Sequence, residues 1–229
     1  MIEFKHVFKK YPNNVLAAED FNVKIKQGEF IYVIGPSGAG KSTFIKMMYR
    51  EERPTSGEVT VNDYELQKMK NSEVPYLRRE LGIVFQDFKL LSKLTVFENV
   101  AYALQVIEKE PDFIETRVNY VLDLVGLKHK AASFPNELSG GEQQRISIAR
   151  AIANKPEIVI ADEPTGNLDP DTASGIMEIL ERINSEGTTI VMATHNSQIV
   201  DEYTHRVLEI DGGKIVRDQP EGGFFQDED

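Results

Sequence analysis

Residues 35–42 constrain the fold of this chain more than any other stretch. They read Gly-Pro-Ser-Gly-Ala-Gly-Lys-Ser and match the pattern G-x-x-x-x-G-K-[ST] at every fixed position. The apolar run 30–34 before them is typical of a buried strand, and residues 43–49 after them read as a helix. Glycines let backbone N–H groups turn toward an anion, and the starting helix adds the positive end of its dipole. The stretch predicts a phosphate-binding loop in an α/β fold; a glycine-rich turn with a chance lysine is the alternative.

Two side chains of this loop indicate the kind of ligand. Lys41 is placed to reach the β- and γ-phosphates of a nucleotide as a point charge. Ser42 offers a hydroxyl to Mg²⁺, an ion that keeps most of its waters and takes few protein ligands. We therefore expect a nucleotide and Mg²⁺ at this loop.

Composition excludes several classes of protein. With 41% hydrophobic and 28% charged residues among 229, the chain can bury a substantial globular core. It has no cysteine, which excludes disulfides and thiolate metal sites, and its net charge of −11 argues against broad binding to nucleic-acid backbones. No apolar run approaches the roughly 20 residues that span a bilayer, and residues 1–6 lack the apolar core of a signal peptide. We expect a cytosolic protein whose membrane role, if any, comes through a partner.

Residues 1–28 alternate between apolar and polar side chains, which predicts two antiparallel strands before the phosphate loop. The turn signal 12–14 separates them and directly follows Tyr11. An aromatic ring at this place could stack on an adenine, and a core or hairpin tyrosine is the alternative. The apolar residues expected to face one way are Ile2, Phe4, Phe21, Val23 and Ile25.

Three further apolar runs, 81–85, 157–161 and 189–194, read as buried strands, and polar side chains follow each of them. Because ligands bind at the carboxyl ends of strands in an open α/β sheet, we expect these polar groups to meet there. Gln86 could reach Mg²⁺ or the attacking water, and Asp162 could hold Mg²⁺ through water. Glu163 could polarise that water, and His195 could bind a γ-phosphate. The alternatives are an ordinary loop glutamine and a carboxylate pair that caps a helix.

From residue 87 to about 154, strand signals vanish and helical periodicity replaces them. We predict one helix after the N-cap Thr95 and a second that Gly126 closes. This region reads as a helical subdomain inserted into the α/β core. The apolar faces expected are Val96, Val100, Ala103, Leu104 and Ile107, then Phe113, Val118, Val121, Leu122 and Val125.

The entry to this helical region is aromatic and apolar. It is either a docking surface for a partner helix or part of the core, and the sequence leaves both readings open. The residues concerned are Phe85, Phe88, Leu90, Leu91, Leu94 and Phe97.

Residues 138–142 predict a second anion-binding helix start. Ser139 and Glu142 have the spacing of a capping box, and a simple helix cap is the alternative interpretation. Gly140 and Gly141, however, would each cost the helix roughly 1 kcal/mol relative to alanine. Glycines at this position make sense if another group approaches the backbone closely, and a bare helix N-terminus binds anions.

The remaining residues predict a capped helix, a hairpin and a tail. Asp169 is expected to cap a helix that Pro170 starts. Strands 206–210 and 214–216 are expected to form a hairpin, and the acidic stretch 218–229 is expected to be disordered. The other histidines read as incidental; they are His6, His129 and His205.

Taken together, these motifs resemble the nucleotide-binding subunits of ABC ATPases along nearly the whole chain. Residues 35–42 are similar to their Walker A loop, 138–142 to their signature, and 158–163 to Walker B with its catalytic glutamate. Tyr11, Gln86, Asp169 and His195 correspond to the adenine-stacking aromatic, Q-loop, D-loop and H-loop residues. The resemblance implies one domain over 1–229, with an α/β core and antiparallel β subdomain in 1–86 and 155–217 and a helical subdomain in 87–154.

The resemblance also implies hydrolysis of ATP, with Mg²⁺, in a head-to-tail homodimer. Glu163, His195 and Gln86 would be catalytic, and Ser42, Gln86 and Asp162 would hold Mg²⁺. The second copy would contribute the signature residues to the same nucleotide. The expected ATP contacts are Tyr11, Gly35, Pro36, Ser37, Gly38, Ala39, Gly40, Lys41, Ser42 and Thr43, with Ser139, Gly140, Gly141 and Glu142 from the other copy.

A finer resemblance is to the ATP-binding proteins of bacterial cell division, through residues 73–79, 85–91, 134–139 and 192–195. It implies a peripheral protein on the cytoplasmic side of the membrane that drives a partner resembling FtsX, contacted through residues 86–94, to control peptidoglycan hydrolysis. Residues 162–169 are shared with efflux and lipoprotein-release ATPases, so a transport ATPase is the alternative. A soluble ATPase acting on nucleic acid is less well supported, because the chain is acidic and carries neither a long coiled coil nor a second ATPase unit.

Overall fold

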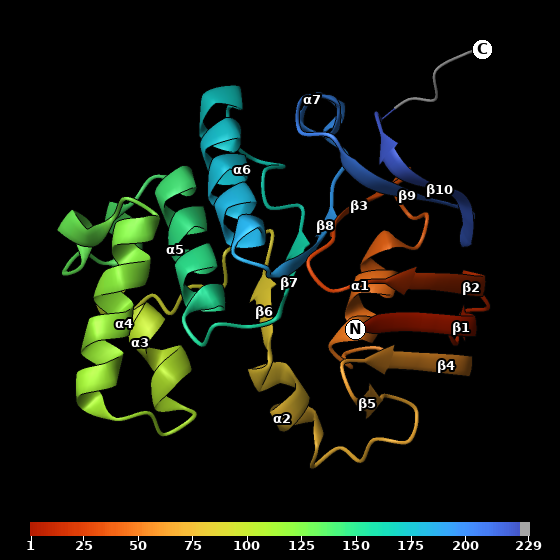
Figure 1. The fold of residues 1–229 in the computed structure, drawn as a ribbon, viewed down its shortest axis with the longest axis horizontal. Helices are drawn as coiled ribbons and strands as arrows, with labels where there is room; N and C mark the ends of the chain where they lie inside the picture. Colours follow the sequence, from red (N-terminus) through yellow and green to blue (C-terminus); the bar gives the residue numbers. More distant parts are fainter. Residues whose placement is uncertain (225–229) are drawn as a thin grey trace.

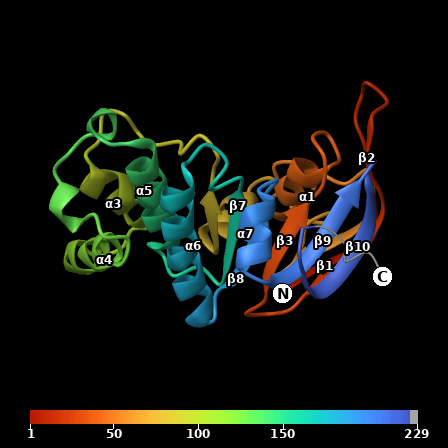
Figure 2. The same cartoon turned by 90° about the horizontal axis from the view of Figure 1, so that it is seen from above.

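A computed structural model describes residues 1–224 and contains two β-sheets and a group of helices (Figure 1). The larger sheet has the strand order β10-β9-β3-β8-β7-β6, and the smaller has the order β2-β1-β4-β5. In both views the helices α3, α4 and α5 lie at one end of the molecule and the smaller sheet lies at the other (Figures 1 and 2). The chain thus has an α/β fold with a mostly parallel sheet and a separate antiparallel one.

The larger sheet is built from the apolar runs predicted as strands. Its members β6 (Leu81–Val84), β7 (Ile158–Asp162), β8 (Thr189–Ala193), β3 (Phe30–Ile34) and β9 (His205–Asp211) pair in parallel. Every residue of β3 and β8 is buried. Alternate side chains of β3 join two different apolar clusters, because successive side chains of a strand point to opposite faces. Both faces of this sheet are therefore covered.

The smaller sheet forms from β1 (Ile2–Lys10), β2 (Leu16–Ile25), β4 (Ser56–Val61) and β5 (Tyr64–Glu65), which pair antiparallel. The predicted alternation is confirmed, because Ile2, Phe4, Phe21, Val23 and Ile25 are all buried. Helix α1 (Lys41–Met48) connects the two sheets: its Phe44 ring stacks on Phe4 at a centroid distance of 4.5 Å. Residues of α1 and of both sheets share one apolar cluster.

The short helix α2 (Val74–Arg79) comes just before β6. Three longer helices come after β6: α3 (Val96–Gln105), α4 (Pro111–Leu124) and α5 (Gly140–Ile152). Thr95 caps α3 as predicted, with the reciprocal hydrogen bonds of a capping box to Glu98. The predicted place of Phe113 on a buried face is wrong. Its side chain is 44% exposed, and Ile114 fills the core position instead. The helix face is therefore displaced by one residue at the start of α4.

The other covering helices are α6 (Pro170–Ser185) and α7 (Ser197–Glu202). The apolar face of α6 joins the same cluster as α3, α4, α5 and one face of the larger sheet. Asp169 caps α6 through a hydrogen bond to the Thr172 N–H, as the sequence predicts. Within the described residues, no helix has the length and apolar character needed to cross a membrane.

The C-terminal hairpin is longer than expected. Strand β10 (Lys214–Gly222) pairs antiparallel with β9, and its pairing continues through Asp218 and Gln219. The expected disorder from residue 218 onward is therefore wrong for residues 218–222. Arg206 forms a two-pronged ion pair with Asp218 at 2.8 Å, and the buried Arg217 donates to the carbonyl oxygens of Gly223 and Phe224. Residues 225–229, the rest of the expected tail, lie outside the described residues.

Candidate nucleotide site

The loop 35–42 is fixed by close packing from strands of both sheets. A Cβ on Gly35 would lie 1.9 Å from the carbonyl oxygen of Ile210 in β9, and one on Gly40 would lie 2.4 Å from that of Ala17 in β2. Both glycines have positive φ angles, 138° and 116°. The backbones of β9 and β2 therefore require glycine at these two positions, whether or not a ligand binds to the loop. By contrast, a Cβ on Gly38 would meet nothing within 4 Å.

The lysine of this loop folds back over it. Lys41 Nζ donates to the carbonyl oxygens of Gly35, at 2.6 Å, and Pro36, at 3.0 Å. Ser42 is exposed in the first turn of α1, whose N-terminal end has no side-chain cap. An anion at the start of α1 would meet backbone N–H groups without partners in the helix, and the hydroxyl of Ser42. The Lys41 ammonium could bind the same anion by exchanging its two carbonyl contacts for it.

Tyr11 lies beside the loop, although it comes from the end of the first hairpin. Its hydroxyl is 3.1 Å from Oγ1 of the buried Thr43. Lys9 Nζ lies over the Tyr11 ring, 4.7 Å from its centroid. Tyr11 also closes the turn, because its N–H donates to the carbonyl oxygen of Val15. Both interpretations of Tyr11, hairpin residue and adenine platform, are thus compatible with this position.

Glu163 and His195 form a contact pair across two strand ends. Glu163 follows β7 with a φ of 50°, and its N–H donates to the carbonyl oxygen of Ala193 in β8. Its Oε2 lies 2.8 Å from His195 Nδ1 and 3.3 Å from the His195 backbone nitrogen. The Glu163 side chain is 12% exposed and the His195 ring 62% exposed. The sheet edge thus presents one held carboxylate and one accessible imidazole.

Asp162 stands next to this pair at the last position of β7. Burial raises the pKa of its carboxyl, and the negative charge of Glu163 raises the pKa further. The ammonium groups of Lys46 and Lys41 act in the opposite direction. The phosphate loop and the end of β7 are therefore close enough for their charges to interact.

The oxygen donors at this edge suit Mg²⁺. A serine hydroxyl, an aspartate carboxylate and a glutamine amide, from Ser42, Asp162 and Gln86, are hard ligands. Gln86 is exposed just after β6. Within residues 1–224, no three His, Cys, Asp or Glu side chains gather closely enough to hold a metal by themselves.

The second predicted anion site begins helix α5. Ser139 Oγ accepts from the N–H of Glu142 at 3.3 Å, and Glu142 Oε2 accepts from the N–H of Ser139 at 2.8 Å, so the capping box is confirmed. The hydrogen bond donated by the Ser139 backbone N–H lowers the pKa of the Glu142 carboxyl. Ser139 and Gly140 are exposed. The helix start is therefore accessible from outside this chain.

The two glycines of this helix start have different surroundings. A Cβ on Gly140 would make only ordinary contacts, 3.8 Å from Leu168 Cδ2 and 3.9 Å from Phe88 Cζ. A Cβ on Gly141 would lie 2.3 Å from Cγ2 of Thr172 in α6. Packing within the chain thus gives a second reason for glycine at position 141, whereas the chain's own contacts do not require glycine at position 140. The approach of a ligand to either glycine stays a prediction.

Asp169 lies in the same neighbourhood and is already engaged. Its Oδ1 accepts from the Thr172 N–H at 3.0 Å and its Oδ2 accepts from Thr172 Oγ1 at 2.6 Å. These bonds lower the pKa of Asp169. Asp169 thus fixes the side chain of Thr172, which packs against Gly141.

His205, which was expected to be incidental, has a defined environment. Its ring stacks on Phe30 at a centroid distance of 4.2 Å, and Nε2 lies 2.5 Å from Glu181 Oε1. His205 begins β9, which is parallel to β3, so it stands at the opposite end of the strands from His195. Its role is to join β9 to α6.

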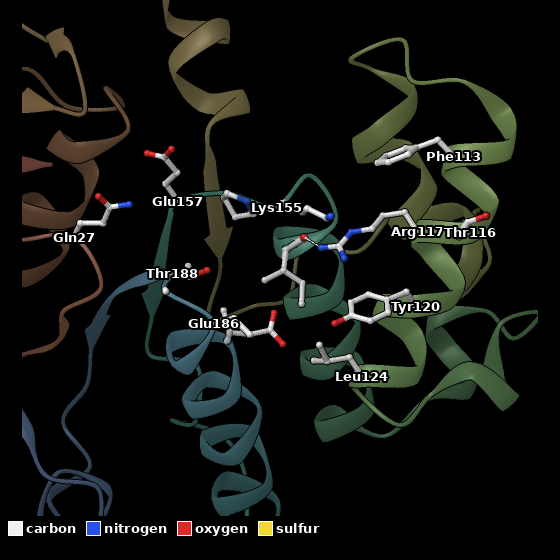
Figure 3. Close-up of a pocket in the computed structure, with 14 residues that line it drawn as sticks. Gln27, Phe113, Thr116, Arg117, Tyr120, Leu124, Lys155, Glu157, Glu186 and Thr188 are labelled. Carbon is white, nitrogen blue, oxygen red and sulfur yellow. Dashed lines mark hydrogen bonds between the residues drawn. The ribbon is translucent and has the colours of Figure 1, made fainter.

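One cavity lies away from the predicted nucleotide site. It has a volume of about 680 Å³ and lies between α4, which contributes Phe113 and Tyr120, and the end of α6, at Glu186 (Figure 3). Glu157 and Thr188, which also line it, come just before β7 and β8 begin. The cavity is therefore at the amino ends of the strands, whereas Asp162 and His195 are at the carboxyl ends.

Comparison with known proteins decides what kind of site this is. Residues 18–166 match the family model described as ABC transporter, and this stretch contains the loop 35–42, the capping box and β7. The chain belongs to the ABC transporter family. As a member, it is an ATP-binding ATPase. The family match ends before Asp169 and His195 and begins after Tyr11.

Individual relatives extend the match to nearly the whole chain. The chain is 61% identical to the cell division ATP-binding protein FtsE of Bacillus subtilis (strain 168), over 98% of both chains. It is 43% identical to FtsE of Escherichia coli (strain K12), over 94% of this chain and 97% of the relative. A dimeric structure of the ATP-binding cassette MJ0796 bound to ADP and Pi is 35% identical, with a TM-score of 0.88 over 98% of this chain and 100% of the other.

Proposed function

We propose that this ATPase binds ATP and Mg²⁺ between two head-to-tail copies and drives an integral membrane partner resembling FtsX, thereby controlling peptidoglycan hydrolysis in bacterial cell division. The shared name of its relatives, cell division ATP-binding protein FtsE, supports the division role. A peripheral location on the cytoplasmic side of the membrane follows from such a partner. The dimeric cassette MJ0796 supports the two-copy arrangement.

The observation that carries the proposal is the separation of the two helix starts that are predicted to bind anions. One is the start of α1 at Lys41, and the other is the exposed start of α5 at Ser139 and Gly140. In both views β6 and β7 lie between α1 and α5 (Figures 1 and 2). Within one copy, the starts of α1 and α5 are on opposite sides of these strands, which does not suit the binding of one γ-phosphate by both. A two-fold axis would bring the start of α5 of a second copy to the start of α1 of the first.

The residues of one copy then divide the chemistry among them. Lys41 exchanges its carbonyl partners for β- and γ-phosphate oxygens, and the N–H groups of residues 38–43 bind the phosphates. Glu163 accepts a proton from water as that water attacks the γ-phosphorus, and the bond to the β-phosphate oxygen breaks to release ADP and phosphate. His195, held by Glu163 at 2.8 Å, binds a γ-phosphate oxygen. Tyr11 contacts the adenine.

Ser42, Asp162 and Gln86 would hold Mg²⁺, which supplies charge neutralisation for the phosphate oxygens. Asp162 suits this role because a buried carboxylate with a raised pKa gains from a cation beside it.

The membrane partner is assigned to residues 86–94. Leu91 is 40% exposed, while Leu90 and Phe97 pack against the apolar core, so only part of the predicted patch is accessible. The alternative partner is a permease of the efflux or lipoprotein-release type, which would use the same surface. The family match, described as ABC transporter, supports retaining this alternative. The net charge of −11 leaves nucleic acid as the least supported partner.

Glu163→Gln tests the proposal. The amide keeps the size of the side chain but cannot accept the proton, so we expect ATP binding with strongly reduced turnover and a dimer with ATP but not with ADP, measured by light scattering after size exclusion. A Lys41→Ala, Glu163→Gln double variant is the control and should stay monomeric. Rapid turnover by Glu163→Gln would remove Glu163 from the role of base.

Capture of the membrane partner distinguishes the division role from the transport alternative. Recovery of a permease with a substrate channel would contradict the division role.

A further inference from the structure

The segment between β6 and α3 is held by an arginine that sequence reasoning did not single out. Arg150, near the end of α5, donates from Nη2 to the carbonyl oxygen of Phe88 at 2.8 Å and from Nη1 to that of Lys89 at 2.6 Å. The planar guanidinium offers two N–H groups in a fixed fork to two successive carbonyls, and a lysine ammonium lacks this fixed bidentate geometry. The sequence shows only an arginine near the end of the helix that begins at Ser139 and Gly140, and its partial burial is known only from the structure.

The two residues that Arg150 holds have an unusual backbone. Phe88 has a φ of 59° and Lys89 a φ of 50°, and neither is glycine. Side chains with a Cβ adopt this left-handed region rarely, and two in succession are rarer still. Such a turn persists only when its surroundings hold it, and the fork of Arg150 bonds directly to it.

This turn sets where the Phe88 ring lies. A Cβ on Gly140 would be 3.9 Å from Phe88 Cζ, so the ring borders the exposed start of α5. Leu168 borders Gly140 at 3.8 Å in the same way. Side chains of a helix tilt toward its N-terminus, which lets Arg150 reach back along α5 toward Phe88. Gln86 precedes Phe88 by two residues, so one turn connects the Gln86 loop to the Ser139–Gly140 helix start.

We propose that Arg150 is a positioning residue, which holds Phe88 against the Ser139–Gly140 helix start and so shapes the site for the nucleotide that a second copy carries. This role rests on the proposed head-to-tail dimer. Without the fork, Phe88 and Lys89 relax to an ordinary backbone conformation and the ring leaves Gly140. The Lys41 loop is unchanged, so a single copy should still bind nucleotide with its usual affinity. ATP-driven dimerisation should be weakened.

The test uses the full chain in the Glu163→Gln background. Arg150→Lys keeps the charge and removes the fork. The control is Arg117→Lys, because Arg117 of α4 makes the same kind of fork, from Nε and Nη2 to the carbonyl oxygens of Ala153 and Ile152 at 2.9 and 2.8 Å. Calorimetry with Mg²⁺ and ADP measures binding to a single copy. Light scattering over an ATP titration measures dimerisation.

We expect Arg150→Lys to keep its ADP affinity within about twofold and to need at least about tenfold more ATP for half-maximal dimerisation. Arg117→Lys should change neither quantity by more than about twofold. Equal dimerisation of Arg150→Lys and its parent would overturn the role, and so would an equal impairment of Arg117→Lys or a matching loss of ADP affinity. A background variant that stays monomeric at saturating ATP would contradict the dimer itself, and this role with it.

Phe88→Ala keeps the test decisive if Arg150→Lys fails to fold. It retains both backbone hydrogen bonds to Arg150 but removes the ring from Gly140. If Arg150 acts through that ring, Phe88→Ala should reproduce the loss of dimerisation, and the double variant should be no worse than either single variant. Losses that multiply in the double variant would show that the two residues act independently.

Discussion

Gly141→Ala should destabilise this protein although alanine is the better helix former. The added Cβ would lie 2.3 Å from Thr172 Cγ2, well inside contact distance. Thr172 cannot rotate away cheaply, since its hydroxyl donates to Asp169 Oδ2 at 2.6 Å and its N–H donates to Asp169 Oδ1 at 3.0 Å. Overpacking of this kind costs about 1–3 kcal/mol, and helix propensity returns up to about 1 kcal/mol. If the whole gain is realised the net loss is about 0–2 kcal/mol, so we expect a loss of about 1 kcal/mol, or about 2–4 °C in Tm.

Two matched variants separate packing from ligand approach. Thr172→Ser removes Cγ2 and retains the hydroxyl bond to Asp169, and the nearest remaining atom, Cβ, is 3.6 Å away. It should therefore restore most of the stability of Gly141→Ala. Gly140→Ala makes only contacts of 3.8 and 3.9 Å, so it should leave the fold unharmed while it weakens ATP-driven dimerisation.

Denaturant unfolding of Gly141→Ala, of Thr172→Ser and of the variant with both changes gives the coupling energy between positions 141 and 172. If Gly141→Ala unfolds like its parent, or if Thr172→Ser returns none of the loss, then the contact with α6 is not what requires glycine at this position.

Three further outcomes follow from the site. Lys41→Ala should lose nucleotide binding by calorimetry, because the ammonium facing the β- and γ-phosphates is gone; normal ATP affinity would contradict the assignment of the loop. Asp162→Asn should lose hydrolysis yet unfold less readily than its parent at neutral pH. The raised pKa of Asp162 means that its contribution to stability is complete below the unfolded pKa, near 3.8, and is lost as pH rises through the folded pKa. The advantage of the asparagine variant in chemical denaturation should thus grow from about pH 4 upward, and a constant advantage would refute this. Leu91→Glu should retain ATP binding and lose capture of the membrane partner, and unchanged capture would exclude this exposed side chain from the interface.

Local patterns in the sequence predicted much of this fold. The strands around the phosphate loop are apolar runs of the right length, and the capping boxes at Thr95 and Ser139 depend on residues three positions apart. Those signals are complete within a few residues, so no tertiary information is needed to interpret them. The contact between Glu163 and His195, after β7 and β8, was also predictable, because neighbouring parallel strands carry their carboxyl ends to one edge. The meeting of Gln86 with them stays a prediction.

What escaped prediction depends on contacts between distant residues. The packing of Gly141 on Thr172 joins residues 31 positions apart, and that of Gly35 on Ile210 joins residues from opposite ends of the chain. Phe113 and Ile114 are both apolar neighbours at the start of α4, and only the packing of the helix selects which one is buried. The extension of β10 depends on Arg206 and Arg217, whose partners cannot be identified from composition.

The tight fit of Gly35 and Gly40 against strands from both sheets has a practical consequence for genetics. A side chain on Gly35 would push the loop away from β9, and one on Gly40 would push it away from β2. We therefore expect cellular proteases to clear either altered chain before its catalytic defect matters. A growth defect in such a strain would measure how much protein survives. An allele at Lys41, whose ammonium donates to two carbonyl oxygens of its own loop, would instead leave a full complement of intact but idle enzyme.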